Sequence, residues 1–264
     1  MGSEPEFAED TVWYKHCISD PASHPVLEFN PDNYWFKVQM KIIEKGLEIS
    51  RGRFLVGMPD LIQNMDTLAS LRGTEQLMLD IYDRPDFVKE RIWQINDVYC
   101  KVFEKIYGKI KDEWNGNAYS AFQIWGPGKT AVVQCDTSAM LSSTAFEEFV
   151  VPALTEQCNF LDNCMYHLDG SQGLHHLEHI LNIRELQAVE FTPEYTAPWG
   201  GDPKWYNLYQ KIFEGGKSIQ AVFVKPEKVI PLIHAIGTEG VFVMVKKQDA
   251  GKALNLLEKL EKYR

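Results

Sequence analysis

His167 and Asp169 stand one residue apart in the stretch CMYHLDGSQG, residues 164–173, where an apolar run meets a glycine. If this run is a β-strand, alternate residues point to one face, so the imidazole and the carboxylate lie together while Leu168 points away. Glu190 stands inside a second apolar run, where a carboxylate without a partner is costly to bury. A metal ion, a proton or a hydrogen-bonded histidine would remove that cost. The three residues predict a site with His167, Asp169 and Glu190 as metal ligands; the alternative is a structural histidine at a strand end.

Other polar residues also follow apolar runs that we expect to be strands. The run RFLVGMPDL contains Asp60, and the run AVVQCD ends in Gln134 and Asp136. In sheets of parallel strands covered by helices, chemistry is found at the C-terminal ends of the strands. We therefore expect Asp136 to act in catalysis together with His167 and Asp169. Asp60 and Gln134 are expected to contact the substrate.

Aromatic residues flank these candidates. Trp125 lies in QIWGPGKT, and Tyr195 and Trp199 lie in FTPEYTAPWGGDPKWY, a stretch rich in glycine, proline and aromatic residues. Aromatic rings beside a few carboxylates suit a small, partly aromatic or methylated compound, so we expect these three residues to line the substrate pocket. The alternative is that the rings only pack on the rim of the fold.

Two further motifs are weak. HHLEH, residues 175–179, matches the H-x-x-E-H pattern of inverted zinc metallopeptidases, but so short a pattern arises easily by chance. We interpret it as the solvated first turn of a helix. GPGKT, residues 126–130, resembles part of a phosphate-binding loop but lacks the GxxxxGK spacing, which indicates a tight turn.

The elements that must position these residues alternate along the second half of the chain. Apolar strands are expected at 164–170, 186–193, 218–224 and 240–246, each followed by a helical pattern, the last over 249–264. Upstream, helices are expected over 32–50 and 74–112, and strands in RFLVGMPDL, YSAFQIW and AVVQC. Nearly continuous apolar strands that alternate with helices predict an α/β fold, a (β/α)8 barrel better than an open sheet. We expect one domain over 1–264, with an irregular segment at 1–35 and a barrel incomplete on its N-terminal side.

Composition excludes several classes of protein. The formal net charge of the chain is −10, and no run of lysines and arginines is present, which disfavours binding to nucleic acid or to an anionic membrane. The five cysteines are scattered without CxxC spacing, which indicates a reducing compartment rather than a disulfide framework. We expect a cytoplasmic protein, without a membrane span, that is able to form a homodimer.

Five stretches together resemble the uroporphyrinogen decarboxylase superfamily, from about Arg53 to the C-terminus. They are GMPDL, DTLASLRGTEQLMLDIYDRPDFVKE, QIWGPGKTAVVQCDTSAMLSSTAFEEFVVPAL, YHLDG and AVEFTP. This superfamily joins the haem-pathway decarboxylase to corrinoid-dependent methyltransferases and, more distantly, to cobalamin-independent methionine synthase. The resemblance implies a (β/α)8 barrel.

The resemblance also implies roles for individual residues. In the methyltransferase branch, zinc is bound by a His-x-Cys pair, a later cysteine and, in the methionine-synthase relatives, a glutamate. His167 matches the histidine and Glu190 the glutamate, but Asp169 stands where the first cysteine is found, and the last expected strand contains no cysteine. The implied ligands therefore offer harder donor atoms, nitrogen and oxygen, than those of the family. They lack the soft thiolate ligands that activate a thiol.

We expect a methyltransferase that moves a methyl group between a small substrate and a corrinoid carried by a partner protein, with zinc as the metal. The first alternative is a carboxy-lyase similar to uroporphyrinogen decarboxylase, with His167 and Asp136 in contact with a tetrapyrrole. The second is a catalytically degenerate barrel that binds a corrinoid or a partner without turnover.

Overall fold

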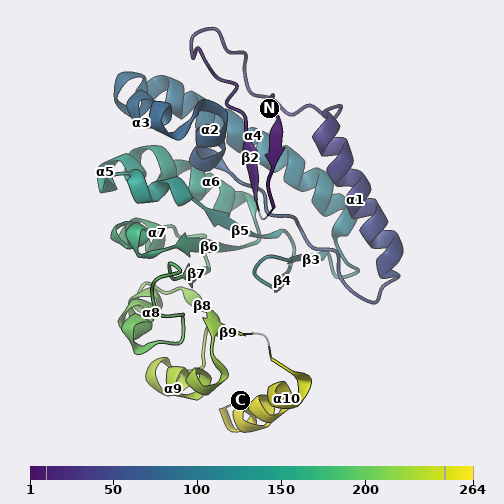
Figure 1. Ribbon diagram of the computed structural model, residues 1–264, viewed down its shortest axis with the longest axis vertical. Coiled ribbons are helices and arrows are strands. Elements are labelled where there is room, and N and C mark those ends of the chain that lie inside the picture. The colour runs from purple at the N-terminus through teal and green to yellow at the C-terminus, as the bar shows by residue number, and fades with distance from the viewer. Residues whose placement is uncertain (10, 247, 264) are drawn as a thin grey trace. The chain divides into compact units, whose positions relative to one another are not determined.

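Strands β5 to β9 form one five-stranded sheet in chain order, and the pairs from β6 to β9 are parallel. The strands are β5 (Thr130–Gln134), β6 (Asn163–Asp169), β7 (Ala188–Thr192), β8 (Ser218–Val224) and β9 (Val241–Val245). This computed structural model describes residues 1–9, 11–246 and 248–263 (Figure 1). The expected α/β class is confirmed. The chain divides into two compact units, residues 1–164 and 165–264, and each is described by itself.

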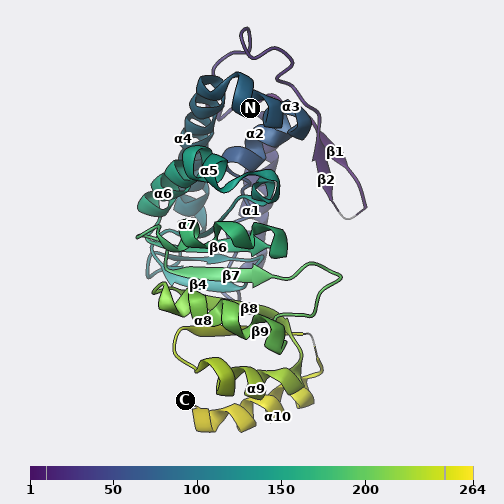
Figure 2. The ribbon, with the colours of Figure 1, turned by 90° about the vertical axis from the view of Figure 1, so that its left-hand side faces the viewer.

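The first unit is mainly helical. Its helices are α1 (Tyr34–Ser50), α2 (Asn64–Arg72), α3 (Thr74–Asp83), α4 (Pro85–Ile110), α5 (Ser143–Ala145) and α6 (Val151–Phe160), with a 3-10 turn at Asp136–Met140 and a π-helical turn at Phe146–Val150. Two antiparallel pairs accompany them: β1 (Pro5–Phe7) with β2 (Val12–Tyr14), visible in Figure 2, and β3 (Gly116–Tyr119) with β4 (Ile124–Pro127). The expected helices over 32–50 and 74–112 are confirmed, and Pro85 begins α4 in the first turn, where its missing N–H costs nothing.

Two expected strands upstream of β5 are wrong. RFLVGMPDL forms only an isolated bridge between Met58 and Tyr119, and Phe54 and Leu55 are half exposed rather than buried. YSAFQIW is broken by a turn between β3 and β4, with Gln123 at a φ of 53°. Both runs contain exposed apolar residues, among them Phe54, Leu55 and Trp125, so their composition alone gave a misleading strand pattern.

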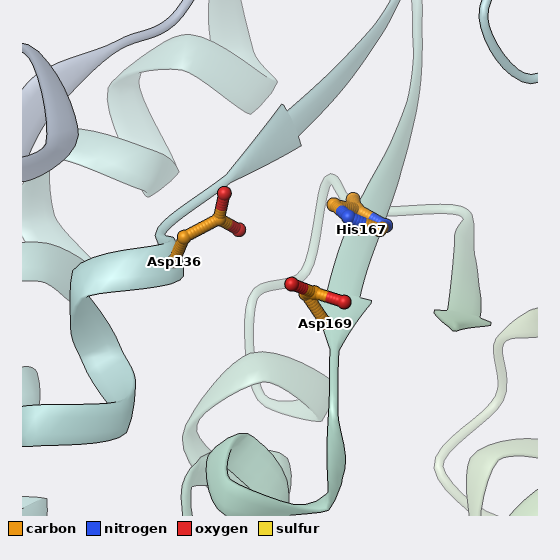
Figure 3. Close-up of side chains that lie close together, drawn as sticks. All are labelled: Asp136, His167 and Asp169. Atoms are coloured by element: carbon orange, nitrogen blue, oxygen red, sulfur yellow. The ribbon is translucent and has the colours of Figure 1, made fainter. Parts of the chain in front are cut away.

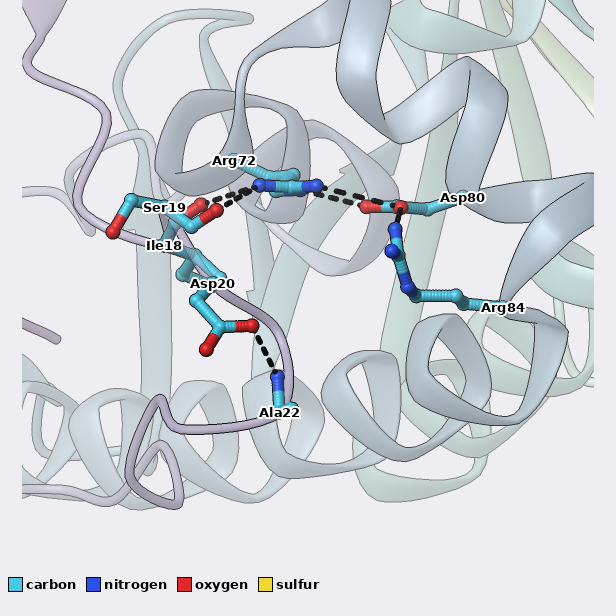
Figure 4. A network of polar contacts seen from close by, with 7 residues as sticks. All are labelled: Ile18, Ser19, Asp20, Ala22, Arg72, Asp80 and Arg84. Carbon is cyan, nitrogen blue, oxygen red and sulfur yellow. Dashed lines mark hydrogen bonds and ion pairs between the residues drawn. The ribbon is translucent and has the colours of Figure 1, made fainter.

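A buried ion pair joins three segments of the first unit (Figure 4). Arg72 Nε donates to Asp80 Oδ2 over 2.7 Å, and Arg84 donates to Asp80 Oδ1 over the same distance. The Arg72 guanidinium also donates to the carbonyl oxygens of Ile18 and Ser19, at 2.9 and 2.8 Å. Burial by itself raises the pKa of Asp80, but the hydrogen bonds from the two arginines outweigh it, and the pKa is lowered from its ordinary value. Arg72, the last residue of α2, therefore links the N-terminal segment to α3.

The second unit follows the expected alternation. Its helices are α7 (Leu177–Leu181), α8 (Tyr206–Glu214), α9 (Pro226–Ile236) and α10 (Ala250–Leu260), with 3-10 turns at Ser171–His176, Pro203–Trp205 and Glu261–Tyr263. The four strands expected between residues 164 and 246 are confirmed as β6 to β9. Arg264, the last residue of the expected final helix, lies outside the described residues. Helices α7, α8 and α9 lie on one side of the strands in Figure 1. Apolar side chains such as Phe191, which packs against Trp205 with ring centroids 4.7 Å apart, fill the space between them.

Within the described ranges, no helix is both long enough and apolar enough to cross a membrane.

The Arg72–Asp80 pair gives a stability prediction. Asp80→Asn removes the charge that compensates a buried guanidinium, so we expect the free energy of unfolding of the first unit to fall by about 3–5 kcal/mol. Urea denaturation followed by circular dichroism measures this change. The control is Asp97→Asn, which breaks the exposed Lys101–Asp97 pair on α4 and should cost less than about 0.5 kcal/mol. Equal losses in both variants would contradict the structural role of the buried pair.

Candidate functional site

A polar row crosses three neighbouring strands of the second unit. The parallel register pairs His167 of β6 with Glu190 of β7, and Glu190 with Gln220 of β8. Two residues further along, Asp169 pairs with Thr192. Because alternate residues of a strand share a face, these five side chains belong to one face of the sheet. Asp169 and Thr192, the last residues of β6 and β7, lie at the C-terminal edge. This edge is where the sequence predicted a site.

Glu190 is bound from both sides. It has no exposed surface, its Oε2 is paired with Nδ1 of His167, and the hydroxyl of Thr192 donates to its Oε1 over 2.7 Å. The sequence left three partners open for the buried carboxylate: a metal ion, a proton or a histidine. In the structure, a hydrogen-bonded histidine is its partner. Since both carboxylate oxygens accept hydrogen bonds, Glu190 is better placed to orient His167 than to bind a metal directly.

The hydrogen bond to Glu190 fixes the imidazole of His167. With Nδ1 donating to the carboxylate, the ring is the tautomer whose lone pair lies on Nε2. Burial raises the pKa of Glu190 from its ordinary value, and the hydrogen bond from His167 opposes part of that rise. The nearby charge of Asp169 adds to it. Burial, the hydrogen bond from His167 and the charge of Asp169 therefore set the pKa of Glu190 together.

The turn after β6 is tied to the turn after β7. The backbone N–H of Gly170 donates to the carbonyl of Thr192 over 2.8 Å, and Gly170 has a φ of 70°, which favours glycine. Ser171 donates to the carboxylate of Glu194 through its N–H, at 3.1 Å, and through its hydroxyl, at 2.8 Å. These hydrogen bonds lower the pKa of Glu194 and hold the backbone next to Asp169 in place.

An aromatic group lies in the loop that follows β7. The Trp199 ring lies 5.0 Å from that of Phe223 and 6.4 Å from that of Tyr195, and Lys246 Nζ is 4.9 Å from its centroid. Phe223 belongs to β8, where the register with β9 shifts, and its φ of 53° is unusual for a residue with a side chain. Tyr195 is 89% exposed. Tyr195 and Trp199, both predicted to bind substrate, thus stand together within the second unit.

This loop is held against α8 and β8. Tyr209 donates to the carbonyl of Gly200 over 2.7 Å, and Trp205 Nε1 donates to the carbonyl of Pro198 over 2.8 Å. A Cβ on Gly200 would lie 2.6 Å from the carbonyl oxygen of Val222, so only glycine permits this close approach. Hydrogen bonds and close packing therefore fix the loop that carries Trp199.

Asp136 lies in the first unit, directly after β5. Its backbone N–H donates to Asp66 Oδ2 over 2.8 Å, and the N–H and hydroxyl of Thr137 donate to Asp66 Oδ1 at 2.8 and 2.6 Å. Gln134, at the end of β5, donates to Asp136 Oδ2 over 3.1 Å. Figure 3 shows Asp136 with His167 and Asp169, the latter two on the same face of β6. Within the first unit, the predicted pair Gln134 and Asp136 is brought together.

Asp60 and Trp125, the other predicted substrate residues, have separate partners in the first unit. Asp60 accepts a 2.6 Å hydrogen bond from the hydroxyl of the buried Tyr119. Trp125 donates to Asp112 Oδ2 over 2.8 Å and packs edge-on against Trp114, both of which precede β3. Asp136, by contrast, follows the end of β5. A substrate contact by Asp60 or Trp125 stays a prediction.

The HHLEH stretch does not form one helical face. Residues 175 and 176 belong to the 3-10 turn, and only 177–181 are α-helical, so the spacing needed for a zinc pair on a regular helix is not met. His176 is fully buried, so the expected solvated helical turn is wrong for this histidine.

Four residues of the site were missed from the sequence. Thr192 and Gln220 gave the same pattern that identified Glu190, a polar residue inside or at the end of an apolar strand, and could have been found. Glu194 and Asp66 act on backbone groups distant in sequence, at Ser171 and Asp136–Thr137, and no local pattern marks such contacts.

Comparison of the chain with protein-family models and with curated proteins finds no match in either set.

The buried carboxyl of Glu190 predicts a pH-dependent stability of the metal-free protein. Because its pKa in the folded state is raised above 4.5, the folded state binds more protons than the unfolded state above that pH, so the contribution of this group to stability falls as pH rises. Glu190→Gln retains an acceptor for Nδ1 but carries no charge. Relative to wild type, we expect this variant to gain melting temperature progressively as pH is raised from about 4.5.

Thermal melts in chelator across pH 4–8 test this expectation. The matched control is Glu258→Gln on α10, which removes an exposed carboxyl and should give a difference that stays flat with pH. A flat difference for Glu190→Gln as well would show that burial does not raise the pKa of Glu190.

Proposed function

We propose that the chain is an enzyme of the uroporphyrinogen decarboxylase type whose strands close a (β/α)8 barrel, and that it transfers a methyl group between a small methylated substrate and a corrinoid carried by a partner protein. The observation that carries this proposal is the hydrogen bond between Glu190 and Nδ1 of His167, with Asp169 two residues further on the same face of β6. A carboxylate behind a histidine is the usual support of a metal-ligating imidazole.

The donor set suits zinc. His167 offers Nε2, and Asp169 offers a carboxylate on the same face of β6. These two ligands of the second unit would leave coordination positions for water and substrate, as catalytic zinc sites do. When bound, zinc would supply a Lewis acid that polarises the atom giving or receiving the methyl group.

The chain's own residues divide the remaining work. Glu190 and Thr192 orient the imidazole and hold its proton on Nδ1, so that Nε2 keeps the lone pair. Tyr195 and Trp199, on the loop pinned by α8, supply ring faces for the apolar or methylated part of the substrate. Because the loop is fixed at Gly200, the Trp199 ring is preorganised and costs little entropy on binding.

A carboxy-lyase is the second candidate, and a specific charge pattern favours it. Lys225 and Lys228 line a small cavity of about 140 Å³ together with Trp199 and the carboxylate of Asp202, and Lys246 lies over the same ring, so cations outnumber anions around it. Ammonium groups around a ring suit a substrate that carries carboxylates. In this case, His167 would contact the substrate directly, and zinc would not be needed.

Zinc titration tests the first candidate. We expect the chelator-treated protein to bind one zinc ion, and we expect His167→Ala and Asp169→Ala to lose this binding. Glu190→Gln should weaken it by about 10- to 100-fold, the usual effect of changing a residue behind a metal ligand. Calorimetry and metal analysis of the dialysed protein measure all three variants.

The matched control is His175→Ala, a histidine of the same unit whose Nδ1 is paired with the carbonyl of Gln172. It should bind zinc as wild type does. Equal loss in His175→Ala and His167→Ala, or no bound zinc in wild type, would contradict the proposed metal site.

Activity separates the two candidates. Incubation of small methoxyarenes or methylamines with a corrinoid protein in its reduced, unmethylated cobalt(I) state should transfer the methyl group to cobalt and release the phenol or amine in wild type and not in His167→Ala. Carboxylate loss from uroporphyrinogen without bound zinc or methyl transfer would favour the carboxy-lyase and contradict the methyltransferase.

A further inference from the structure

A cavity of about 460 Å³ lies in the first unit, among the β1–β2 pair, α1 and α2. We propose that it binds a neutral small molecule with an aromatic or alicyclic body and one hydroxyl or carbonyl group. None of the residues proposed above for methyl transfer lines it. Its occupation would be a second binding function, independent of the site on β6 and β7.

The lining is mainly apolar and partly exposed to solvent. Phe7, Tyr14 and Trp35 contribute rings, and the Phe7 and Trp35 rings lie 5.5 Å apart. Phe7 is 69% exposed and Ile42 is 60% exposed, so apolar surface surrounds the opening. Exposed apolar groups that gather around a cavity of this size are typical of ligand sites.

One polar group in the lining points to a specific ligand chemistry. Thr67, on α2, is 3% exposed, and its hydroxyl has no hydrogen-bond partner in the described structure. A buried hydroxyl without a partner destabilises the protein, and a ligand hydroxyl or carbonyl would remove that cost. Its neighbour Ser70 lines the same cavity, but its hydroxyl already donates to the carbonyl of Asp66 over 3.0 Å.

The charge and the volume of the cavity further restrict the class of ligand that it can bind. Of the described side chains that line the cavity, none carries a formal charge, and the amino group of Met1 is the one charged group among the lining residues. A ligand charge placed away from that group would lose water without compensation, which favours a neutral ligand. A volume of about 460 Å³ accepts a bicyclic aromatic compound with room to spare. The chemistry is therefore that of a naphthol or a similar hydroxylated ring.

Two probes that differ by one hydroxyl test the proposal on the full chain. We expect 1-naphthol to bind wild type about tenfold more tightly than naphthalene, measured by ligand fluorescence and by chemical shifts of the Trp35 indole. Thr67→Val should abolish this difference by weakening 1-naphthol alone. It should also raise the melting temperature of the ligand-free protein, because the unpaired hydroxyl is gone.

Ser70→Ala is the matched control and should leave the tenfold difference unchanged. Val38→Phe, on α1, fills the cavity and should weaken both probes by at least tenfold while the circular dichroism stays that of wild type. Equal affinity of the two probes in wild type, an unchanged difference in Thr67→Val, or unchanged binding in a folded Val38→Phe would each overturn the proposal. Zinc binding has no bearing on these outcomes, so the two sites can fail separately.

Discussion

Glu190 lies on the central strand of a five-stranded sheet with no exposed surface, and a carboxylate in that position requires donors on its neighbours. The parallel register provides them, with His167 directly across on β6 and Thr192 two residues along β7. A slip of one residue between β6 and β7 would place Leu168 beside the carboxylate and His167 on the helix-facing side. The cost of that slip makes the polar row a determinant of register as well as a candidate site.

In the second unit, one face of the sheet packs against helices and the other face carries the polar residues of the candidate site. One face carries Phe191, which packs against Trp205, and so anchors the 3-10 turn before α8. Through Trp205 and Tyr209 this packing also holds the loop after β7 in place. The polar face carries His167, Asp169 and Glu190. The apolar face therefore supplies the rigidity that a preorganised site on the polar face requires.

Much of this arrangement could be predicted from the sequence, because strand alternation is a local pattern. The apolar run 164–169 with a histidine and an aspartate at alternate positions predicted a shared face, and the cost of burying Glu190 predicted that it has a partner. The sequence did not tell which of the possible partners it has, since a metal and a histidine satisfy a carboxylate equally well. Runs such as RFLVGMPDL misled the strand prediction because their apolar residues, including Phe54 and Leu55, cover the surface rather than the core. The contacts of Asp66 and Glu194 with distant backbone groups depend on tertiary structure and leave no local pattern.

The central claim is that Glu190 accepts the proton of Nδ1 and so keeps the lone pair of His167 on Nε2. Nitrogen-15 NMR of the histidine rings in the metal-free protein at neutral pH, with the His167 signals assigned by their loss in His167→Gln, measures this directly. The account predicts a protonated Nδ1 and an unprotonated Nε2, and an Nε2 resonance that shifts when zinc is added. An unprotonated Nδ1, with the proton on the carboxyl of Glu190 and on Nε2, would contradict it.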